Sequence, residues 1–389
     1  MTDVPPPKKR IEFIDLLRGW AVIVMIETHV FNATLVPGLT DSPFFQVLKF
    51  VNGLVAPAFL FASGMAYAVT TRRKLNDYLS FGRPLFRQIG RLLFILIIGY
   101  SLHIPKFSYA HLRYDAGATA WEMFWQADVL QCIAVSLLFL QLMLLVTRSE
   151  DRLYRIVAGV AAGIVLATPL MWGIDFRGTI PAPLAAYLNG RQYSLFPIFP
   201  WSAFLFAGAI AGHVYVRAKD RVAGGGDPVG VMMGRMVRVA GGLIVVSFLL
   251  HPLAAVVYPY YEYWRISPSF FMLRLGIVLL LCAGLFLYER RRGVAAGSFV
   301  ALMGRESLLV YATHLLLVYG KFGPFTFTDR VGGTFGYGEA IVTTLILLGL
   351  MYALASAWSR IKTGPDRRKR AVQLVILAGF VLVFFYGPR

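Results

Sequence analysis

The sequence is poor in charged residues and very poor in cysteine. Only 15% of its 389 residues are charged and only two are cysteines, whereas 58% are hydrophobic. A soluble protein would carry about 25% charged residues, so the composition excludes a soluble globular protein and indicates an integral membrane protein. Cys132 and Cys282 both lie inside apolar stretches, which argues against a disulfide framework.

Acidic residues are also scarce, because 20 Asp and Glu stand against 38 Lys and Arg and leave a net charge of +18. The basic residues occur in short clusters between apolar stretches, which is typical of membrane topology signals. We therefore expect the lipid bilayer, and not a nucleic acid, as the partner of these clusters. The sequence also lacks an internal repeat, a glycine-rich nucleotide motif and an evident cleavable signal. Its scattered histidines do not have metal-ligand spacing, so no metal is expected.

Eleven separated apolar stretches approach the ~20 residues needed to cross ~30 Å of hydrocarbon. They predict an all-α, polytopic bundle of about eleven transmembrane helices, of which the third and the last are short. The predicted spans are 12–35, 48–70, 88–104, 128–147, 154–173, 196–217, 237–258, 270–289, 298–320, 338–359 and 371–387.

The loops between these spans alternate between many and few basic residues. If the amino terminus is cytoplasmic, the basic loops all fall on the cytoplasmic side, so we expect the amino terminus inside and the carboxyl terminus outside. Residues 1–10 would then form a basic cytoplasmic tail, and residues 11–389 a single membrane domain. Because no eukaryotic targeting signal is evident, we expect a bacterial inner membrane.

The first span carries an unusual number of polar residues on one face. At 100° per residue, Asp15, Arg18 and His29 lie on the same side of the helix, with Asn32 beside His29. Arg18 and His29 are separated by about 16 Å along the axis, so they would lie near opposite ends of the helix. Ionisable residues in lipid cost roughly 2.5–3.5 kcal/mol each on insertion scales, and several on one helix indicate a function.

The ninth span repeats this arrangement. It begins with the charged pair Arg305 and Glu306, and Ser307, Tyr311 and His314 then share one face. A charged group at the cytoplasmic end again precedes a histidine in the outer half. The two histidines are therefore the main candidates for proton transfer or nucleophilic chemistry.

The same residues also have simpler interpretations. Asp15 and Arg18 have the i,i+3 spacing of a pair that neutralises itself near the interface. A single histidine near a helix end often serves packing only. The polar residues could also line the path of a transporter or flippase for a lipid-linked glycan, although no internal repeat supports this. A non-catalytic scaffold would explain the spans but not the polar face.

The motif Arg10-x4-Asp15-x2-Arg18-Gly19 followed by His29 resembles the opening helix of the transmembrane acyltransferases. Within that group, the chain is most similar to bacterial relatives of heparan-alpha-glucosaminide N-acetyltransferase. The further matching stretches are Ala56-Pro-Ala-Phe-Leu-Phe-Ala-Ser-Gly64, Asp128-Val-Leu-Gln-Cys-Ile-Ala134, Phe196-Pro-Ile-Phe-Pro-Trp201 with Gly208, and Gly304-Arg-Glu-Ser-Leu308 with Tyr311 and His314. That family places its histidine in a His-Ala-x-Trp stretch of an outer loop, whereas residues 35–49 contain no histidine here. The assignment to His29 therefore follows the broader acyltransferase pattern.

The resemblance implies transfer of an acyl group, with acetyl-CoA or another acyl-CoA as co-substrate in the cytoplasm. The acceptor would be an amino sugar or another glycan group on the outer side. We expect His29 to act as general base or acyl carrier, with His314 as the second candidate. The expected CoA-binding residues are Asp15, Arg18, Arg305 and Glu306, and the expected substrate-orienting residues are Asn32, Gln131 and Trp201. The sequence leaves open the acyl chain, N- or O-transfer, direct transfer or an acyl-histidine, and whether the chain forms a homodimer.

Overall fold

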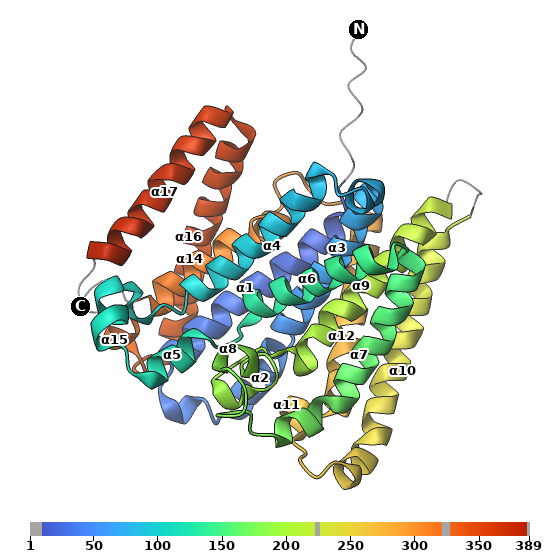
Figure 1. Ribbon diagram of the computed structural model, residues 1–389, viewed down its shortest axis with the longest axis horizontal. Helices are drawn as coiled ribbons and strands as arrows, with labels where there is room; N and C mark the ends of the chain where they lie inside the picture. The colour runs from blue at the N-terminus through green and yellow to red at the C-terminus, as the bar shows by residue number, and fades with distance from the viewer. Residues whose placement is uncertain (1–9, 222–225, 321–326, 387–389) are drawn as a thin grey trace.

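The computed structural model describes residues 10–221, 226–320 and 327–386, and these residues form a bundle of helices (Figure 1). They contain one isolated β-bridge, between Leu35 and Phe335. The long helices are α1 (Glu12–Thr34), α3 (Val55–Leu79), α4 (Arg83–Ser101), α6 (Val129–Thr147), α7 (Glu150–Gly173), α9 (Ile198–Asp220), α10 (Pro228–Val257), α12 (Pro268–Arg292), α14 (Ser307–Tyr319), α16 (Tyr337–Thr363) and α17 (Asp366–Tyr386). The shorter ones are α2 (Pro43–Asn52), α5 (Ala118–Phe124), α8 (Ala182–Ala185), α11 (Tyr263–Ile266), α13 (Phe299–Arg305) and α15 (Phe327–Val331).

The two ends of the bundle differ. The turns that join α3 to α4, α6 to α7 and α16 to α17 lie at the end nearer the N terminus, and we call it the basic end because Arg and Lys residues cluster there (Figure 1). The short helices α2, α5, α8, α11 and α15 gather towards the other end, which we call the loop end (Figure 1). Alternation of the loops between the two ends agrees with the expected arrangement of the spans. Which end faces the cytoplasm stays a prediction.

The described residues contain nine helices that are long and apolar enough to cross a membrane, and the bent pair of α13 and α14 is a tenth candidate. Helix α1 also has a spanning length of 23 residues, but its polar side chains keep it out of that set. The expected all-α polytopic membrane architecture is therefore confirmed. The expected tail, residues 1–10, lies outside the described residues except for Arg10, and the single membrane domain stays a prediction.

Two predicted spans contain a break in the helix, although residues Pro43–Leu79 together still form one candidate membrane span. The span predicted at 48–70 is divided between α2 and α3 at Gly53 and Leu54. The Asn52-Gly53 pair ends α2, and Pro57 is tolerated in the first turn of α3, where backbone N–H groups have no helical partner. The span predicted at 298–320 is divided at Glu306, where α13 and α14 meet at 87°.

Capping residues explain where several helices begin. The hydroxyl of Ser267 accepts a hydrogen bond from the N–H of Phe270 at 2.9 Å, and Pro268 occupies the first turn of α12. At the start of α10, the carboxylate of Asp227 accepts a hydrogen bond from the N–H of Gly230 at 2.9 Å, and Pro228 occupies the first turn. This helix starts nine residues before the predicted residue 237. The hydrophobic pattern alone did not locate this start, because Arg235 and Arg238 interrupt the apolar residues of the first turns of α10.

Glycines allow two helix pairs to pack backbone against backbone. In the pair α3 and α9, a Cβ on Gly64 would overlap the carbonyl oxygen of Leu205, and a Cβ on Gly208 would overlap that of Phe61. Helix α1 packs against α13 in the same way, through Gly19 and Gly304. Small residues at helix crossings are the usual means of close association in membranes, where apolar surface alone gives no advantage. These contacts fix the position of α1 at the centre of the bundle.

This packing makes a prediction for stability. Gly64→Ala or Gly208→Ala should lower the free energy of unfolding by about 1–3 kcal/mol, because a methyl group must displace a neighbouring backbone. Gly163→Ala is the matched control on α7, where a Cβ meets nothing within 4 Å, and it should be neutral or stabilising by about 0.5–1 kcal/mol. Thermal unfolding of purified protein in detergent measures both. Equal melting temperatures for all three variants would contradict the packing described here.

Candidate functional site

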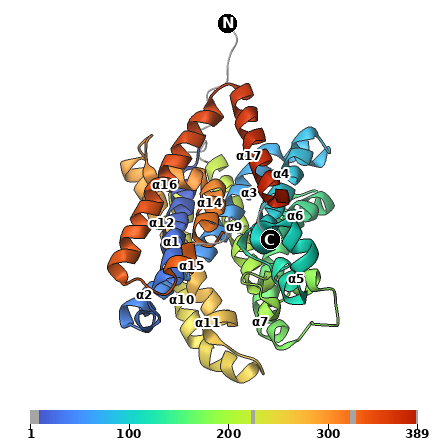
Figure 2. The ribbon, with the colours of Figure 1, turned by 90° about the vertical axis from the view of Figure 1, so that its left-hand side faces the viewer.

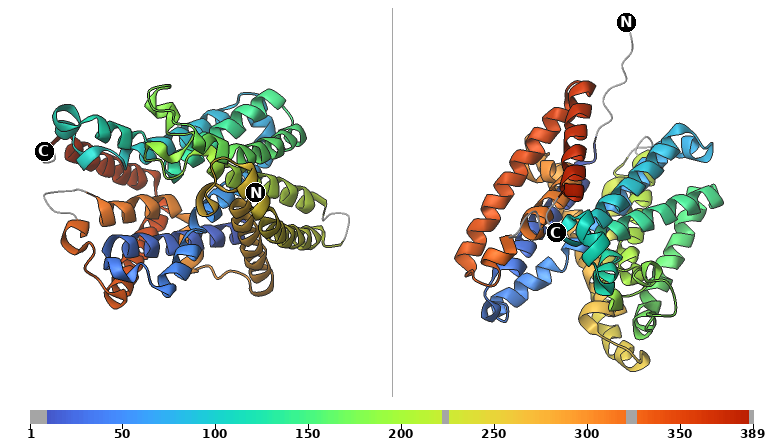
Figure 3. Two further views of the ribbon diagram at one scale, coloured as in Figure 1. Left: turned by 90° about the horizontal axis from the view of Figure 1, so that it is seen from below. Right: turned by 60° about the vertical axis from the view of Figure 1, so that its left-hand side comes forward.

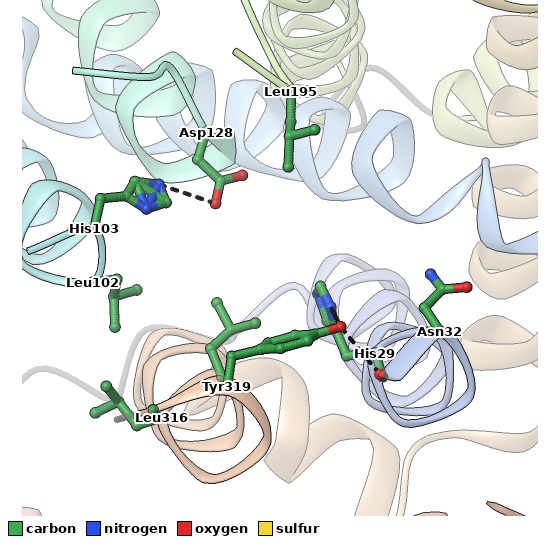
Figure 4. A pocket seen from close by; sticks show the side chains of 10 residues that line it. His29, Asn32, Leu102, His103, Asp128, Leu195, Leu316 and Tyr319 are labelled. Carbon is green, nitrogen blue, oxygen red and sulfur yellow. Dashed lines mark hydrogen bonds and ion pairs between the residues drawn. The ribbon is translucent and has the colours of Figure 1, made fainter. Parts of the chain in front are cut away.

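A cavity of about 390 Å³ lies in the loop-end half of the bundle (Figure 4). Its polar side chains come from two walls: His29, Asn32 and Tyr319 from α1 and α14, and His103 and Asp128 from the segments that follow α4 and precede α6. The remaining lining consists of Leu102, Leu195 from the loop before α9, Leu315, Leu316 and Gly320. In Figure 4 the two polar groups face each other across the cavity.

Tyr319 fixes the orientation of His29. The hydroxyl of Tyr319 donates to the carbonyl oxygen of His29 at 3.1 Å, and its oxygen lies 3.3 Å from Nδ1 of the imidazole. Because the phenol proton is used in the bond to the carbonyl, we assign the proton of this second hydrogen bond to Nδ1. The imidazole is therefore held as the Nδ1–H tautomer, which leaves the lone pair of Nε2 available to accept a proton.

His314 lies behind His29 and does not line the cavity. Its side chain is fully buried, and its ring centroid lies 5.3 Å from that of His29. Nδ1 of His314 donates to the carbonyl oxygen of Val310 at 2.8 Å, so this imidazole is also held in one tautomer. The structure thus brings together the two histidines that the sequence singled out, but it gives them different positions: His29 borders the cavity and His314 supports it.

The opposite wall contains a pair that sequence reasoning did not assign to the site. His103 Nε2 lies 3.5 Å from Asp128 Oδ2, and Tyr311 donates to the same carboxylate oxygen at 3.4 Å. The sequence carried two signals for this pair, since His103 ends a predicted span and Asp128 opens the next matching stretch. Neither signal could reveal that the ends of α4 and α6 meet across from His29.

The charged residues at the basic end form a separate cluster around α1. Asp15 is buried and pairs with Arg10 at 3.1 Å, and Glu306 is buried and pairs with Lys362 at 2.6 Å. Arg18 donates to the hydroxyl of Ser307 at 2.5 Å. The i,i+3 ion pair between Asp15 and Arg18 is therefore not formed. Instead, each acidic residue is held by a cation other than Arg18.

Two of the expected substrate-orienting residues do not line this cavity. Gln131 is buried on α6, and its amide lies where a Cβ on Gly99 of α4 would be. The indole of Trp201 lies under the guanidinium of Arg274, 5.6 Å from the ring centroid to Cζ. Asn32, by contrast, lines the cavity one helical turn beyond His29 (Figure 4). The role of all three residues in orienting a substrate stays a prediction.

The fold and the cavity define the class of protein: a polytopic, all-helical membrane protein with an internal polar site. The sequence also matches the family model described as heparan-alpha-glucosaminide N-acetyltransferase, catalytic, over residues 10–253. This match covers more than half of the chain, so the chain belongs to that family, as its resemblance indicated. The family is one of membrane acetyltransferases. None of the curated proteins gives a significant match.

The family match covers one wall of the cavity more completely than the other. It includes His29, His103 and Asp128, but it ends before His314 and Tyr319 on α14. The structure, and not the family match, shows that α14 packs against α1. This packing brings residues from the last third of the chain to the site.

The tautomer of His29 can be measured directly. Tyr319→Phe removes the oxygen that accepts the Nδ1 proton, so nitrogen-15 NMR of histidine-labelled protein should show His29 changing from the Nδ1–H form to a mixture. The loss of both hydrogen bonds should also lower stability by about 1–2 kcal/mol. Tyr261→Phe is the matched control, because the Tyr261 hydroxyl bonds Nδ1 of His251 at 2.7 Å outside the cavity. An unchanged His29 spectrum in Tyr319→Phe would overturn the assignment.

Proposed function

We propose that this protein transfers an acetyl group from acetyl-CoA, which enters from the basic end, to a glycan or amino-sugar acceptor at the loop end. Membership of the family supports acetyltransferase activity in general. The observation that carries the proposal is the position of His29: its imidazole borders a polar cavity, and Tyr319 holds it with Nε2 as the proton acceptor. An imidazole whose Nε2 lone pair is free at a cavity is suited to general-base catalysis.

The proposed step is attack of the acceptor on the thioester carbonyl. Nε2 of His29 takes the proton of the attacking group as the new bond forms, the carbon–sulfur bond breaks, and the same proton passes to the leaving thiolate. General-base assistance of this kind is worth about 10²–10⁴-fold in rate. His314 acts as a positioning residue that packs against the ring of His29. Transfer through an acetyl-histidine on His29 would use the same atom as nucleophile.

Arg18 is the residue best suited to hold the CoA moiety. It lies between the basic end and the cavity on the same helix as His29, about 16 Å away along the axis, which is comparable to an extended pantetheine arm. Its Nε is buried without a hydrogen-bond partner among the described residues. Because Asp15 and Glu306 are paired with Arg10 and Lys362, Arg18 keeps its charge available for a phosphate or carbonyl oxygen. Arg305, at the end of α13, would add a second cation to this path.

The orientation follows from the distribution of basic residues. We propose that the basic end is cytoplasmic, where acetyl-CoA is available, and that the loop end faces the outer side of a bacterial inner membrane. Acceptor and donor would then approach the cavity from opposite sides of the bilayer. A transporter that moves a glycan without modifying it is the alternative function, and transfer activity distinguishes the two.

The role of His29 can be tested in vesicles that contain a glucosamine-bearing acceptor inside and labelled acetyl-CoA outside. His29→Ala should lower the rate of acceptor labelling by about 10²–10⁴-fold, because the proton acceptor is lost. His251→Ala is the matched control, since that histidine also bonds a tyrosine hydroxyl but lies outside the cavity, and it should label at the wild-type rate. Equal labelling by wild type and His29→Ala would refute the role of His29. Uptake of acceptor without any labelling would favour transport.

The role of Arg18 gives an independent test. Acetyl-CoA should raise the melting temperature of the wild-type protein, because a ligand that binds the native state stabilises it by mass action. Arg18→Gln should weaken acetyl-CoA binding by about 10- to 100-fold, since one charge-assisted hydrogen bond is lost. Arg177→Gln serves as control, because this exposed arginine pairs with Asp175 in the loop after α7. If Arg18→Gln and wild type bind acetyl-CoA equally, Arg18 is not part of the CoA site.

A further inference from the structure

A second cavity, of about 250 Å³, lies at the basic end of the bundle and shares no lining residue with the cavity at His29. Its walls come from the last turns of α3, the turn between α6 and α7, and the second half of α9. Leu75 is the one apolar residue among the described residues that line it. None of these residues takes part in the proposed acetyl transfer. The contacts of the charged side chains show which charges are already paired.

Two of the three arginines that line this cavity are held by carboxylates. Arg72 donates to Oε2 of Glu150 at 3.0 Å. Arg217 pairs with Asp151, and Nε2 of His213 lies 3.3 Å from the same carboxylate oxygen. These contacts connect α3, α7 and α9 around the cavity, so its walls are fixed by ion pairs between separate helices.

Arg148 is the third arginine, and it forms no ion pair with any residue that the structure describes. Its guanidinium makes one long contact, 3.4 Å from Nη2 to the carbonyl oxygen of Leu79. Arg148 stands just before α7, a helix of 24 residues whose first N–H groups have no partner within the helix. An unpaired guanidinium beside such a helix end is suited to an anion with several oxygens, such as a phosphate.

Glu150 adds an acceptor to the same cavity. Its side chain is only 7% exposed, and Arg72 occupies only Oε2. Among the described residues, Oε1 has no hydrogen-bond partner, and neither has the buried hydroxyl of Tyr154 one turn later on α7. A buried carboxylate oxygen without a donor is costly. An ammonium group would supply three N–H donors and a positive charge.

The surroundings of the cavity indicate that the ligand comes from the membrane. Leu142 and Val146 lie on one face of α6, both are exposed, and this apolar face leads to Arg148. Arg148 also contacts the turn between α3 and α4, where Phe81 is exposed. The acyl chains of a phospholipid can lie along these side chains while its headgroup enters the cavity. Basic pockets between the ends of transmembrane helices are recurrent sites for phospholipid headgroups.

We propose that this cavity binds the headgroup of a membrane phospholipid that carries a primary ammonium group. Its phosphate binds Arg148 and the N terminus of α7, and its ammonium binds Glu150. A purely anionic headgroup would leave Oε1 of Glu150 without a donor and would face two carboxylates, those of Glu150 and Asp151. A choline headgroup has the positive charge but no N–H to donate. The bound lipid would join the α6–α7 turn to α3 and α9, and this role does not depend on acetyl transfer.

Three phospholipids with the same acyl chains test the headgroup assignment. Dioleoyl-phosphatidylethanolamine, dioleoyl-phosphatidylcholine and dioleoyl-phosphatidylglycerol are titrated separately into the detergent-purified protein, and native mass spectrometry counts the bound lipid. We expect phosphatidylethanolamine to bind about 10-fold more tightly than the other two, because it alone donates a charge-assisted hydrogen bond to Glu150. It should also raise the melting temperature most.

Two variants separate the two halves of the headgroup. Glu150→Gln keeps the size of the side chain but removes its charge, so it should remove the preference for phosphatidylethanolamine. Arg148→Gln should weaken binding of all three lipids by about 10-fold, because all three carry the phosphate. Arg148 is exposed and unpaired among the described residues, so this variant tests the site even if Glu150→Gln loosens the contact with α3.

Matched controls are available on an exposed loop that precedes α8. Asp175 pairs with Arg177 at 2.6 Å, and that guanidinium lowers the pKa of the Asp175 carboxyl to about 2. Asp175 is therefore charged at pH 7 and forms an ion pair, but it lies far from the basic end. Asp175→Asn and Arg177→Gln should both keep the affinity and the lipid preference of the wild type.

The outcomes that contradict this site are distinct. Equal binding of the three lipids by wild type, or an unchanged preference in Glu150→Gln, would overturn the ammonium assignment. Glycerophosphoethanolamine has the same headgroup without acyl chains, and stabilisation by it at the same concentration would overturn the assignment to a lipid. Loss of acetyl-CoA binding in Arg148→Gln would give the cavity to CoA instead. If acetyl-CoA fails to bind even the wild type while phosphatidylethanolamine binds as expected, the proposed transfer fails and the lipid site stands.

Discussion

The close packing of α1 against α13 and α14 is the constraint on which the site depends. Gly19 and Gly304 let the backbones of α1 and α13 touch, and the chain then turns by 87° at Glu306. Without that turn, α14 would continue away from the half of α1 that carries His29. With it, Tyr319 and His314 reach the imidazole from a helix almost 300 residues further along the chain. Helices α1 and α14 lie side by side within the bundle (Figures 2 and 3), and residues next to the ends of α4 and α6 form the opposite wall of the cavity.

This arrangement separates the two chemical tasks along one helix. Near the basic end, α1 carries a half-buried arginine, Arg18, whose acidic neighbours are already paired with other cations. Near the loop end it carries a histidine in a defined tautomer at the edge of a cavity. A donor with phosphates at one end and a thioester at the other matches this polarity. On the second wall, His103 Nε2 lies 3.5 Å from Asp128 Oδ2 and faces the cavity from the opposite side.

Much of this could be read from the sequence, because the relevant physics is local to single helices. The composition indicated the membrane, the basic loops indicated how the spans alternate, and the 100° periodicity put Asp15, Arg18 and His29 on one face. Arg18 and His29 indeed face the interior of the bundle, where they contact Ser307 and Tyr319. The family match supports the resemblance that the opening motif carried.

The remaining features depend on contacts between distant segments, which a single sequence does not contain. The break at Glu306 was not predicted because residues 298–320 are apolar enough for one helix. The residues that bind Ser307 and Glu306 at the break, Arg18 and Lys362, lie on other helices. The same holds for Asp128, which looks like an ordinary N-cap in sequence but meets His103 and Tyr311 in space. Gln131, one turn later, packs against Gly99 of α4 and does not line the cavity.

The central claim is that the acetyl group reaches the cavity bordered by His29 with the CoA moiety extending towards Arg18. A cryo-EM structure of the protein with a thioether analogue of acetyl-CoA tests this most directly. The account predicts that the thioester carbonyl lies in the cavity beside the His29 imidazole, with room between its carbon and Nε2 for the attacking group of the acceptor, and that the phosphates lie at the basic end. An analogue bound outside this cavity, or one with its phosphates at the loop end, would contradict the account.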